Sequence, residues 1–511
     1  MSSPSGASRN RASGPYFEDN ETAPDLPPII SSDDPTADFP EDDSLAPRPG
    51  PGQRAVLRDG DLSYPPEPRA QQDGRIDQPE QQTIVDGIDP MTIDTRSAED
   101  FDAFENPPAG YDPLLFQIED IDPLSDRRTR RLARFEPYDP VGIRIGSFVM
   151  FPEIEIGGSG YSNVLRSQNP QSDVAIDVRP TVRVVSDWNR HALEFSVAST
   201  LSFYNEFDSE NDRAYRLEAR GRVDITSRTN VQAFAAREYS QESRSAIDAN
   251  AAGERADLTL HRGGGTISHR FNRLTLQLRG SVNDYQYSDV DVGGVTQSNR
   301  DRNYTATEEA IRATWEFKPT LQAFTEVAIN QRRYETIAQS DGISRDSDGE
   351  RYRVGLSFGT TGRVLRGEVA VGYGRQTPTD GRLEPIEGII VDANIAWRPT
   401  ELTTVLLNAR SDVSETTTAG SGGVFTRAAG VEVRHAFRRH LIGTAGITYT
   451  DQDYVGVPIA ENEILGDLGL EYFLSREAVL FGRYRHTRFN SNSPGASYDS
   501  DEVKVGVRLR R

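Results

Sequence analysis

Charged side chains recur at every second position in several segments of this sequence, and aliphatic side chains fill many of the positions between them. In residues 173–187 the odd positions include Asp177, Arg179 and Arg183, whereas the even positions from 174 to 184 are aliphatic or proline. Successive side chains of a β-strand point to opposite faces, so this alternation predicts strands with one ionic and one oily face. The residues predicted to line the lumen of such a sheet, on its ionic face, are Arg179, Arg183, Arg216, Glu218, Arg220, Arg222, Asp224, Arg279, Arg312, Glu326, Arg353, Glu368, Asp392, Arg410, Glu432 and Arg434.

Arginine and carboxylate side chains interleaved on one face allow two kinds of chemistry. Opposite charges on neighbouring strands form cross-strand pairs that stiffen a hydrated wall, and this is the interpretation that we favour. Alternatively, the mixed charges create a transverse field that acts on polar or sugar-like solutes. A strongly ion-selective lining is not expected, because it requires rings of a single sign.

No arrangement of residues predicts catalysis or metal binding. The chain has no cysteine, so neither a disulfide framework nor a structural zinc site is expected. Four of the six histidines fall near predicted turns and the other two are isolated, so a Ser/His/acid set is not expected either. The run Gly263-Gly264-Gly265 is interpreted as a strand or bulge feature, since no helix follows it to form a phosphate loop. We therefore predict no enzyme activity, no cofactor and no metal, and the absence of a basic stripe argues against a nucleic-acid partner.

The alternating segments are organised as antiparallel hairpins. Eight short polar turns occur between Trp188 and Glu477, and longer loops rich in Gly, Ser, Asp and Asn separate one hairpin from the next. This arrangement predicts about 18 strands, the first from Gly142 to Gly157 and the last near 499–510. It is typical of a transmembrane antiparallel up-and-down β-barrel of 16 to 18 strands. Both ends of the barrel then lie on the short-turn side, which in bacterial barrels is the periplasmic side.

A soluble β-sandwich shows the same alternation with its oily face as the core, but the aromatic residues favour a membrane barrel. All three tryptophans lie near the short turns, together with Phe271, Phe317, Phe437 and Phe473. The tyrosines that gather towards the long loops are Tyr204, Tyr239, Tyr285, Tyr287, Tyr304, Tyr334, Tyr373, Tyr449, Tyr454 and Tyr498. We therefore expect two interfacial aromatic girdles, with outer-membrane lipid between them.

The first 140 residues differ in composition from the rest. Residues 1–140 hold 30 acidic and 13 basic side chains, whereas residues 141–511 hold 49 and 44, so most of the net charge of −22 lies in the N-terminal part. We predict a disordered, acidic, Pro-rich periplasmic tail over residues 1–110, a linker or short amphipathic helix over 111–140, and the barrel over 141–511. Residues 1–10 lack the charged start and apolar core of a secretion signal, so no signal peptide is visible in this chain.

The segment FEPYDPVGIRIGSFVMFPEIE at residues 135–155, followed by Tyr161-Ser162-Asn163-Val164, resembles the opening of a family of bacterial outer-membrane β-barrel porins common in alphaproteobacteria. The resemblance covers roughly residues 136–511. It implies an outer-membrane location, insertion by the barrel-insertion machinery and, as one option, export of exopolysaccharide or capsule. It carries over no active-site residues. The chain departs from barrels in general at Arg511, where an aromatic residue is the usual assembly signal.

Two functions are compatible with these features. The first is a porin-like, water-filled channel for polar solutes or polysaccharide export, in which Gly293-Gly294 and Gly422-Gly423 allow loops to fold inward and narrow the bore. The second is a non-transporting outer-membrane anchor or surface protein whose acidic tail binds periplasmic partners.

Overall fold

The computed structural model describes residues 138, 140–188, 190–242, 255–359 and 364–511. The tail predicted for residues 1–110 lies outside these ranges, as does almost all of the linker predicted for 111–140. Within the described ranges, no helix is long and apolar enough to cross a membrane. The helical elements there are two short 3-10 turns, η2 (Asp208–Glu210) and η3 (Arg300–Arg302).

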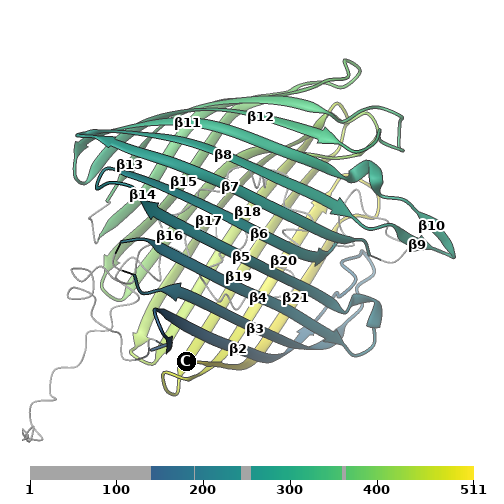
Figure 1. The fold of residues 1–511 in the computed structure, drawn as a ribbon. Coiled ribbons are helices and arrows are strands. Elements are labelled where there is room, and N and C mark those ends of the chain that lie inside the picture. The colour runs from purple at the N-terminus through teal and green to yellow at the C-terminus, as the bar shows by residue number, and fades with distance from the viewer. Residues whose placement is uncertain (1–137, 139, 189, 243–254, 360–363) are drawn as a thin grey trace, which may run out of the picture. The chain divides into compact units, whose positions relative to one another are not determined.

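Eighteen long strands in the described part of the chain form one antiparallel sheet that closes on itself (Figure 1). Each barrel strand pairs with the next, and the last strand pairs with the first from Glu153↔Arg510 to Tyr161↔Glu502. The barrel strands are β2 (Phe148–Tyr161), β3 (Asp173–Ser186), β4 (Ala192–Tyr204), β5 (Asp212–Asp224), β6 (Thr229–Gln241), β7 (Asp257–Phe271), β8 (Leu274–Tyr287), β11 (Tyr304–Lys318), β12 (Leu321–Tyr334), β13 (Ser347–Phe358), β14 (Leu365–Pro378), β15 (Ile386–Thr400), β16 (Thr403–Ser414), β17 (Gly423–Arg438), β18 (Leu441–Val455), β19 (Ala460–Phe473), β20 (Ala478–Ser491) and β21 (Tyr498–Arg510). The closed ring confirms the predicted up-and-down barrel.

The connections alternate in length around the ring, as the sequence predicts. Short turns join strands at one end, where the C-terminus also lies, and the longer loops lie at the opposite end (Figure 1). One of these loops carries its own small hairpin, β9 (Val290–Val292) with β10 (Val295–Gln297), which protrudes beyond the ends of the barrel strands. The turn at Gly293-Gly294 therefore projects beyond the barrel, so this loop does not adopt the inward fold that its glycines allow.

The first predicted strand is divided in two. Residues Ile143–Ile145 form a short strand, β1, that folds back onto the start of β2, with Ile143 opposite Met150. Gly146 has a φ of 60°, a left-handed conformation that glycine adopts readily, and it forms the turn. Within β2, Pro152 lies just beyond the β21 ladder, which begins at Glu153. The missing N–H of this proline is therefore placed where that ladder has not yet started.

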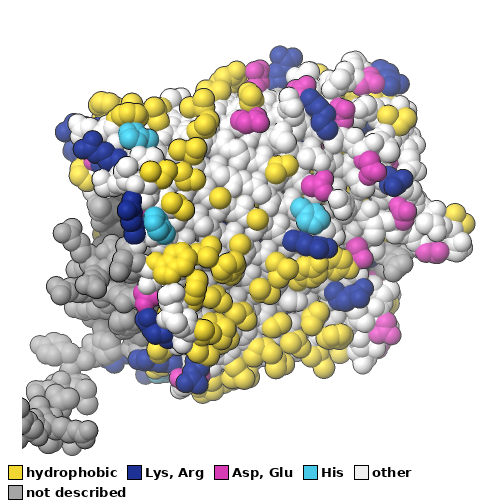
Figure 2. All heavy atoms as spheres, viewed as in Figure 1, with side chains coloured by type: hydrophobic (Ala, Val, Ile, Leu, Met, Phe, Trp, Pro, Cys, Tyr) yellow, Lys and Arg dark blue, Asp and Glu magenta, His cyan; other side chains and the backbone are white. Residues whose placement is uncertain are grey.

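Aliphatic side chains cover the outside of the ring. Val174 and Ile176 of β3, Leu278 of β8 and Val505 of β21 are exposed, and each is next to an inward polar residue in the sequence. Figure 2 shows hydrophobic side chains spread over β2 to β5, whereas acidic side chains gather towards the end that carries the long loops. Because an exposed oily surface of this extent is unfavourable in water, the ring belongs in lipid rather than in a soluble sandwich.

One aromatic girdle is present and the other is incomplete. Trp315, Trp397, Phe271, Phe317 and Phe437 are exposed on the outer face near the short turns, as predicted. Phe473 of that set is instead buried on the inner face.

Most of the ten tyrosines near the long loops also point inward. Tyr373 and Tyr449 are exposed on the outer face, but Tyr204, Tyr285 and Tyr454 are buried inside. Tyr304 stacks between Tyr285 and Tyr334, with ring centroids 4.4 and 5.0 Å apart. The prediction of a complete tyrosine girdle was wrong because proximity to a loop does not fix the face on which a side chain lies; the parity of each strand does.

Three inward phenylalanines each lie directly opposite a glycine of the neighbouring strand. The pairs are Phe234 with Gly264, Phe324 with Gly355 and Phe481 with Gly506. A Cβ added to Gly264 would meet the Phe234 ring at 2.7 Å, and one added to Gly506 would meet the Phe481 ring at 2.5 Å. The glycines thus let the rings lie flat against the wall, so that a large side chain occupies little of the interior.

Candidate functional site

All 16 residues predicted on the ionic face lie on the side of the sheet opposite the exposed aliphatic side chains. Strand register establishes this placement: Arg216, for example, is opposite Glu238, and Glu326 is opposite Arg353. Several of the 16 are buried, including Arg179, Arg216 and Arg353. That these residues line a conducting lumen remains a prediction, but the structure shows how their charges are arranged.

Arginines from three other strands surround Glu326 of β12. It forms an ion pair with Arg353 of β13, lies 3.2 Å from Arg279 of β8 and 3.8 Å from Arg312 of β11. Arg353 also reaches Asp392 of β15 at 2.6 Å, passing the inward Gly372 of β14. A cluster of this kind joins strands that are not direct neighbours, and its charges are compensated within the wall.

Arg312 lies flat on an aromatic ring. Its guanidinium carbon is 3.5 Å from the centroid of Phe324, which itself covers Gly355. From there the guanidinium donates to Glu368 of β14 at 3.0 Å, and Ser357 donates to the same carboxylate at 2.7 Å. Cation–π contact and ion pairing together hold this long side chain along the wall instead of across the bore.

A second cluster lies on β5 to β7. Arg216 donates to Glu218 at 2.6 Å, and Arg220 pairs with the same carboxylate. Glu238 of β6 accepts from Arg262 of β7 at 3.0 Å and lies 3.5 Å from Arg216. Other predicted residues have nearby partners as well: Arg222 bonds Asp224, Arg410 bonds Asp412, and Arg183 lies over Phe151.

A third cluster closes the ring and was only partly included among the predicted site residues. Lys504 of β21 lies 3.0 Å from Asp177 of β3 and 3.7 Å from Glu155 of β2. Arg508 contacts Glu153, Glu155 and Glu471, the last at 2.9 Å. The alternation in β2 and β21 carried the signal for these residues, because Glu153, Glu155, Lys504 and Arg508 have the inward parity. Their partners could not be identified from the sequence, since they come from opposite ends of the chain.

Two neighbouring strands, β15 and β16, separate before they reach the end that carries the long loops. The ladder between β15 and β16 runs from Thr400↔Thr403 only as far as Asp392↔Arg410. Beyond that point β15 continues to Ile386 on β14, and β16 continues to Ser414 on β17. The upper parts of β16 and β17 with their loop, residues 411–427, therefore separate from β15, while β17 stays paired with β18 up to Gly423↔Val455. We call residues 411–427 the inner hairpin.

Apolar packing shows that the inner hairpin lies inside the barrel. Val413 and Phe425 occupy the parity that faces lipid lower in the same strands, yet both are buried against Ile386 and Ile390. These two isoleucines are on the inward face of β15, whereas Ile389 between them is 69% exposed outside. The outer face of the hairpin is thus applied to the inner face of the wall. Phe425 lies over Gly388 of β15, where an added Cβ would meet the ring at 3.1 Å.

The tip of the inner hairpin is bonded to β12, which is four strands away from β16 around the ring. Arg332 of β12 is buried, pairs with Glu415 and donates to the carbonyl of Val413 at 3.1 Å. The hydroxyl of Tyr334 donates to Glu415 at 2.8 Å. These contacts place the hairpin across the inner faces of β13, β14 and β15.

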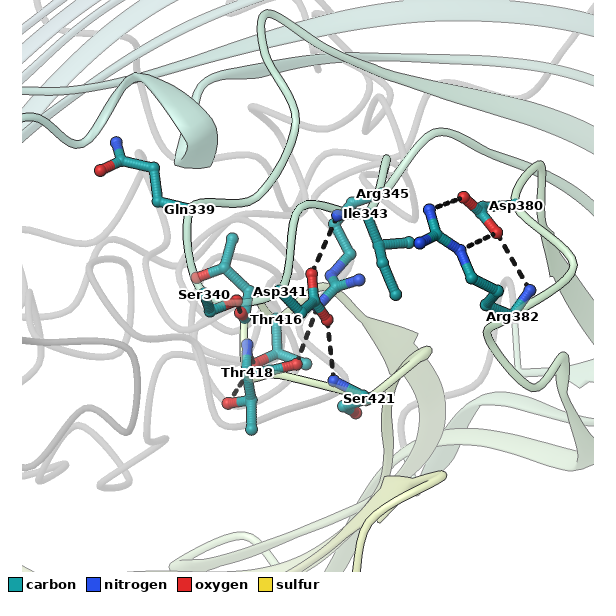
Figure 3. A network of polar contacts seen from close by, with 12 residues as sticks. Gln339, Ser340, Asp341, Ile343, Arg345, Asp380, Arg382, Thr416, Thr418 and Ser421 are labelled. Carbon is teal, nitrogen blue, oxygen red and sulfur yellow. Dashed lines mark hydrogen bonds and ion pairs between the residues drawn. The ribbon is translucent and has the colours of Figure 1, made fainter.

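A neighbouring loop holds the tip through a polar network (Figure 3). In the loop between β12 and β13, Asp341 accepts from the backbone N–H of Gly420 at 2.9 Å and from Arg345 at 2.8 Å. Arg345 also donates to the carbonyl of Thr418 at 2.9 Å, and Ser340 donates to that of Thr417 at 2.6 Å. Three of these four bonds reach the hairpin, so the loop at residues 335–346 fixes the backbone of the hairpin tip, and the Arg345–Asp341 bond orders the loop itself.

Ionisation strengthens this network. Burial opposes the charge of Asp341, but donation from Gly420 and Arg345 outweighs it and lowers the pKa of Asp341 below its ordinary value. In the adjacent loop, hydrogen bonding from Arg382 lowers the pKa of Asp380 to about 2. Both carboxylates are therefore charged at neutral pH.

The inward fold at Gly422-Gly423 agrees with what the sequence allows. Gly423 has a φ of 139°, and a Cβ there would collide with Ile386, so the chain can approach β15 closely only with glycine at this position. Arg332, Glu415, Asp341 and Arg345 were not among the predicted site residues. Within the described residues, no group of three or more histidine or acidic side chains is placed to hold a metal ion.

A family model described as "Putative beta-barrel porin 2" matches residues 136–511. The chain belongs to this family. No curated protein matches the sequence. The barrel porin fold and the family place the protein in the bacterial outer membrane, as a porin-like barrel embedded in lipid.

Solved outer-membrane barrels are similar to this porin in structure at low sequence identity. OccK3 (OpdO) from Pseudomonas aeruginosa has 15% identity and a TM-score of 0.37, with 71% of this chain and 95% of that chain covered. The siderophore receptor PirA from Acinetobacter baumannii has 6% identity and a TM-score of 0.39, with coverage of 71% and 80%. The alcaligin receptor FauA from Bordetella pertussis has 10% identity and a TM-score of 0.34, with coverage of 72% and 76%.

Proposed function

We propose that this barrel is a diffusion channel for polar solutes of low net charge, sugars among them. The ion pairing of the inward charges supports this proposal above all. Clusters around Glu326, Glu218 and Lys504 each combine both signs, so these inward residues of the described strands form no ring of one sign. A solute that passes such a wall meets many hydrogen-bonding groups but no strong field that selects anions or cations.

Single-channel recording tests this proposal. Purified, folded barrel added to a planar bilayer is expected to give stepwise conductance, and a KCl gradient is expected to give a reversal potential close to zero. Proteoliposomes should swell in neutral sugars. A sealed bilayer with verified folded protein would refute the channel, and a large reversal potential would refute its weak selectivity.

The same recordings distinguish two alternative functions, polysaccharide export and a non-transporting anchor. If the protein serves polysaccharide export, added polysaccharide should enter and block the open channel, with block that depends on the side of addition. If it is a non-transporting anchor, no steps occur, and residues 1–140 used as bait should retain periplasmic partners. The first outcome would identify polysaccharide as a substrate of the channel. The second would show that the protein is an anchor and not a channel.

A further inference from the structure

We propose that the inner hairpin is the constriction of the channel, and that the Arg332–Glu415 pair and the Asp341 loop hold it in place. The inference rests on the proposed function, because a constriction has meaning only if solutes pass. It assigns a specificity-determining role, the limit on solute size, to residues of the inner hairpin and its anchors.

The inner hairpin lies inside the barrel. Other long loops within the described residues connect strands that remain paired to both neighbours almost to their ends, but β16 separates from β15 after Arg410. The hairpin then runs inside the wall, over β15, β14 and β13, until Arg332 of β12 binds it. It therefore narrows the interior of the barrel alongside β13, β14 and β15.

The inner hairpin is held rigidly in its position. An element that sets pore size must resist displacement, and this one is held on both of its sides. Its apolar side packs Val413 and Phe425 onto Ile386 and Ile390. Its polar tip is held by the buried Arg332–Glu415 pair and by three hydrogen bonds with Ser340, Asp341 and Arg345. A mobile surface loop would not need a buried ion pair, which is costly to desolvate.

The exposed part of the hairpin tip carries no charge. The tip is rich in threonine and glycine, TTTAGSGG at residues 416–423 (Figure 3). Thr416 and Ser421 are buried, whereas Thr417 and Thr418 are partly exposed and Ala419 and Gly420 are exposed. Hydroxyls and backbone groups exchange hydrogen bonds with neutral polar solutes without adding charge. The constriction thus matches the low-charge solutes proposed for the channel.

The test uses two double variants of the full chain that differ by one position along β12. Arg332→Gln with Glu415→Gln removes the inner pair without leaving one charge unpaired. Arg333→Gln with Asp348→Asn removes the adjacent ion pair, which lies on the outer face at the surface. Heat-modifiable migration on gels verifies that each variant is folded.

We expect the inner variant to raise single-channel conductance about twofold or more and to admit larger sugars in liposome swelling. The outer variant should conduct as the wild type does. If the wild type conducts but the inner variant shows unchanged conductance and size limit, the constriction is refuted; if the wild type itself does not conduct, the proposed function fails instead.

A cross-link tests the position of the hairpin independently of transport. The chain contains no cysteine, so Ser340→Cys with Thr417→Cys introduces the only thiols. A short bis-maleimide should join them in the folded protein, since Ser340 Oγ lies 2.6 Å from the carbonyl oxygen of Thr417. Pairing Gly294→Cys with Thr417→Cys provides the matched control, which should remain unlinked. Equal linking of both pairs, or none of either, would contradict the fixed inward position.

Discussion

Glu326 shows how single residues hold this barrel together. Its carboxylate is nearly inaccessible, with 1% of its surface exposed, and arginines from β8, β11 and β13 surround it. A carboxylate buried in this way is stable only because the positive partners compensate its charge. The partners in turn depend on it, since Arg279 and Arg353 are directed at the same group.

Glu326→Gln should therefore destabilise the barrel by about 3 kcal/mol, the usual cost of removing one partner of a buried ion pair. Urea-induced unfolding in lipid vesicles, followed by tryptophan fluorescence, measures the change. Glu350→Gln is the control, because Glu350 lies on the outer face of β13, and we expect it to cost less than about 0.5 kcal/mol. Equal effects of the two substitutions would contradict the importance of the inner cluster.

The inner hairpin is the element in which local sequence and tertiary structure disagree. By alternation alone, Val413 and Phe425 belong to the lipid-facing side of β16 and β17, yet they pack inside the barrel. The divergence of β15 from β16 reverses the environment of these residues without any change in their parity. Glycines at 388, 422 and 423 give room for this approach.

The pH dependence of the conductance should show whether Asp341 keeps the inner hairpin in place. Because its folded pKa is lowered, the charged form is favoured by the network, and that contribution is complete above the ordinary value of 3.8 and is lost as pH falls through the lowered pKa. Conductance should thus stay constant from pH 8 to about 5 and rise only in stronger acid. Asp341→Asn should show raised conductance already at pH 7, whereas Asp380→Asn in the adjacent loop should not. Identical behaviour of both variants would exclude a specific role for Asp341.

Alternation along the sequence was sufficient to predict most strands, the short turns and the inward parity of the 16 ionic residues. Period-two patterning predicts these features because every side chain of a strand has only two directions available. The partners of Glu326, the inner hairpin and the inward tyrosines were not predictable in the same way. They depend on which residues of different strands lie side by side. The sequence of one strand does not determine its register with a distant strand.

At the scale of the whole barrel, the long loops and the short turns define two chemically different ends. We infer that the short-turn end, which also carries the ends of β2 and β21, faces the periplasm. Gly294→Cys in the β9–β10 turn should then react with a membrane-impermeant maleimide on intact cells. Arg439→Cys in the short turn between β17 and β18 should react only after the outer membrane is permeabilised. The opposite labelling pattern would invert the orientation.

The pairing of β2 with β21 has a consequence for biogenesis. Residues more than 340 positions apart in the chain must meet before any edge of the sheet is protected. Until the final segment has been synthesised and delivered, β2 presents unpaired backbone N–H and C=O groups that cannot be left in lipid. Assembly is thus necessarily completed after translation, and a chain truncated within its last few dozen residues is expected to be a substrate for proteolysis rather than a smaller pore.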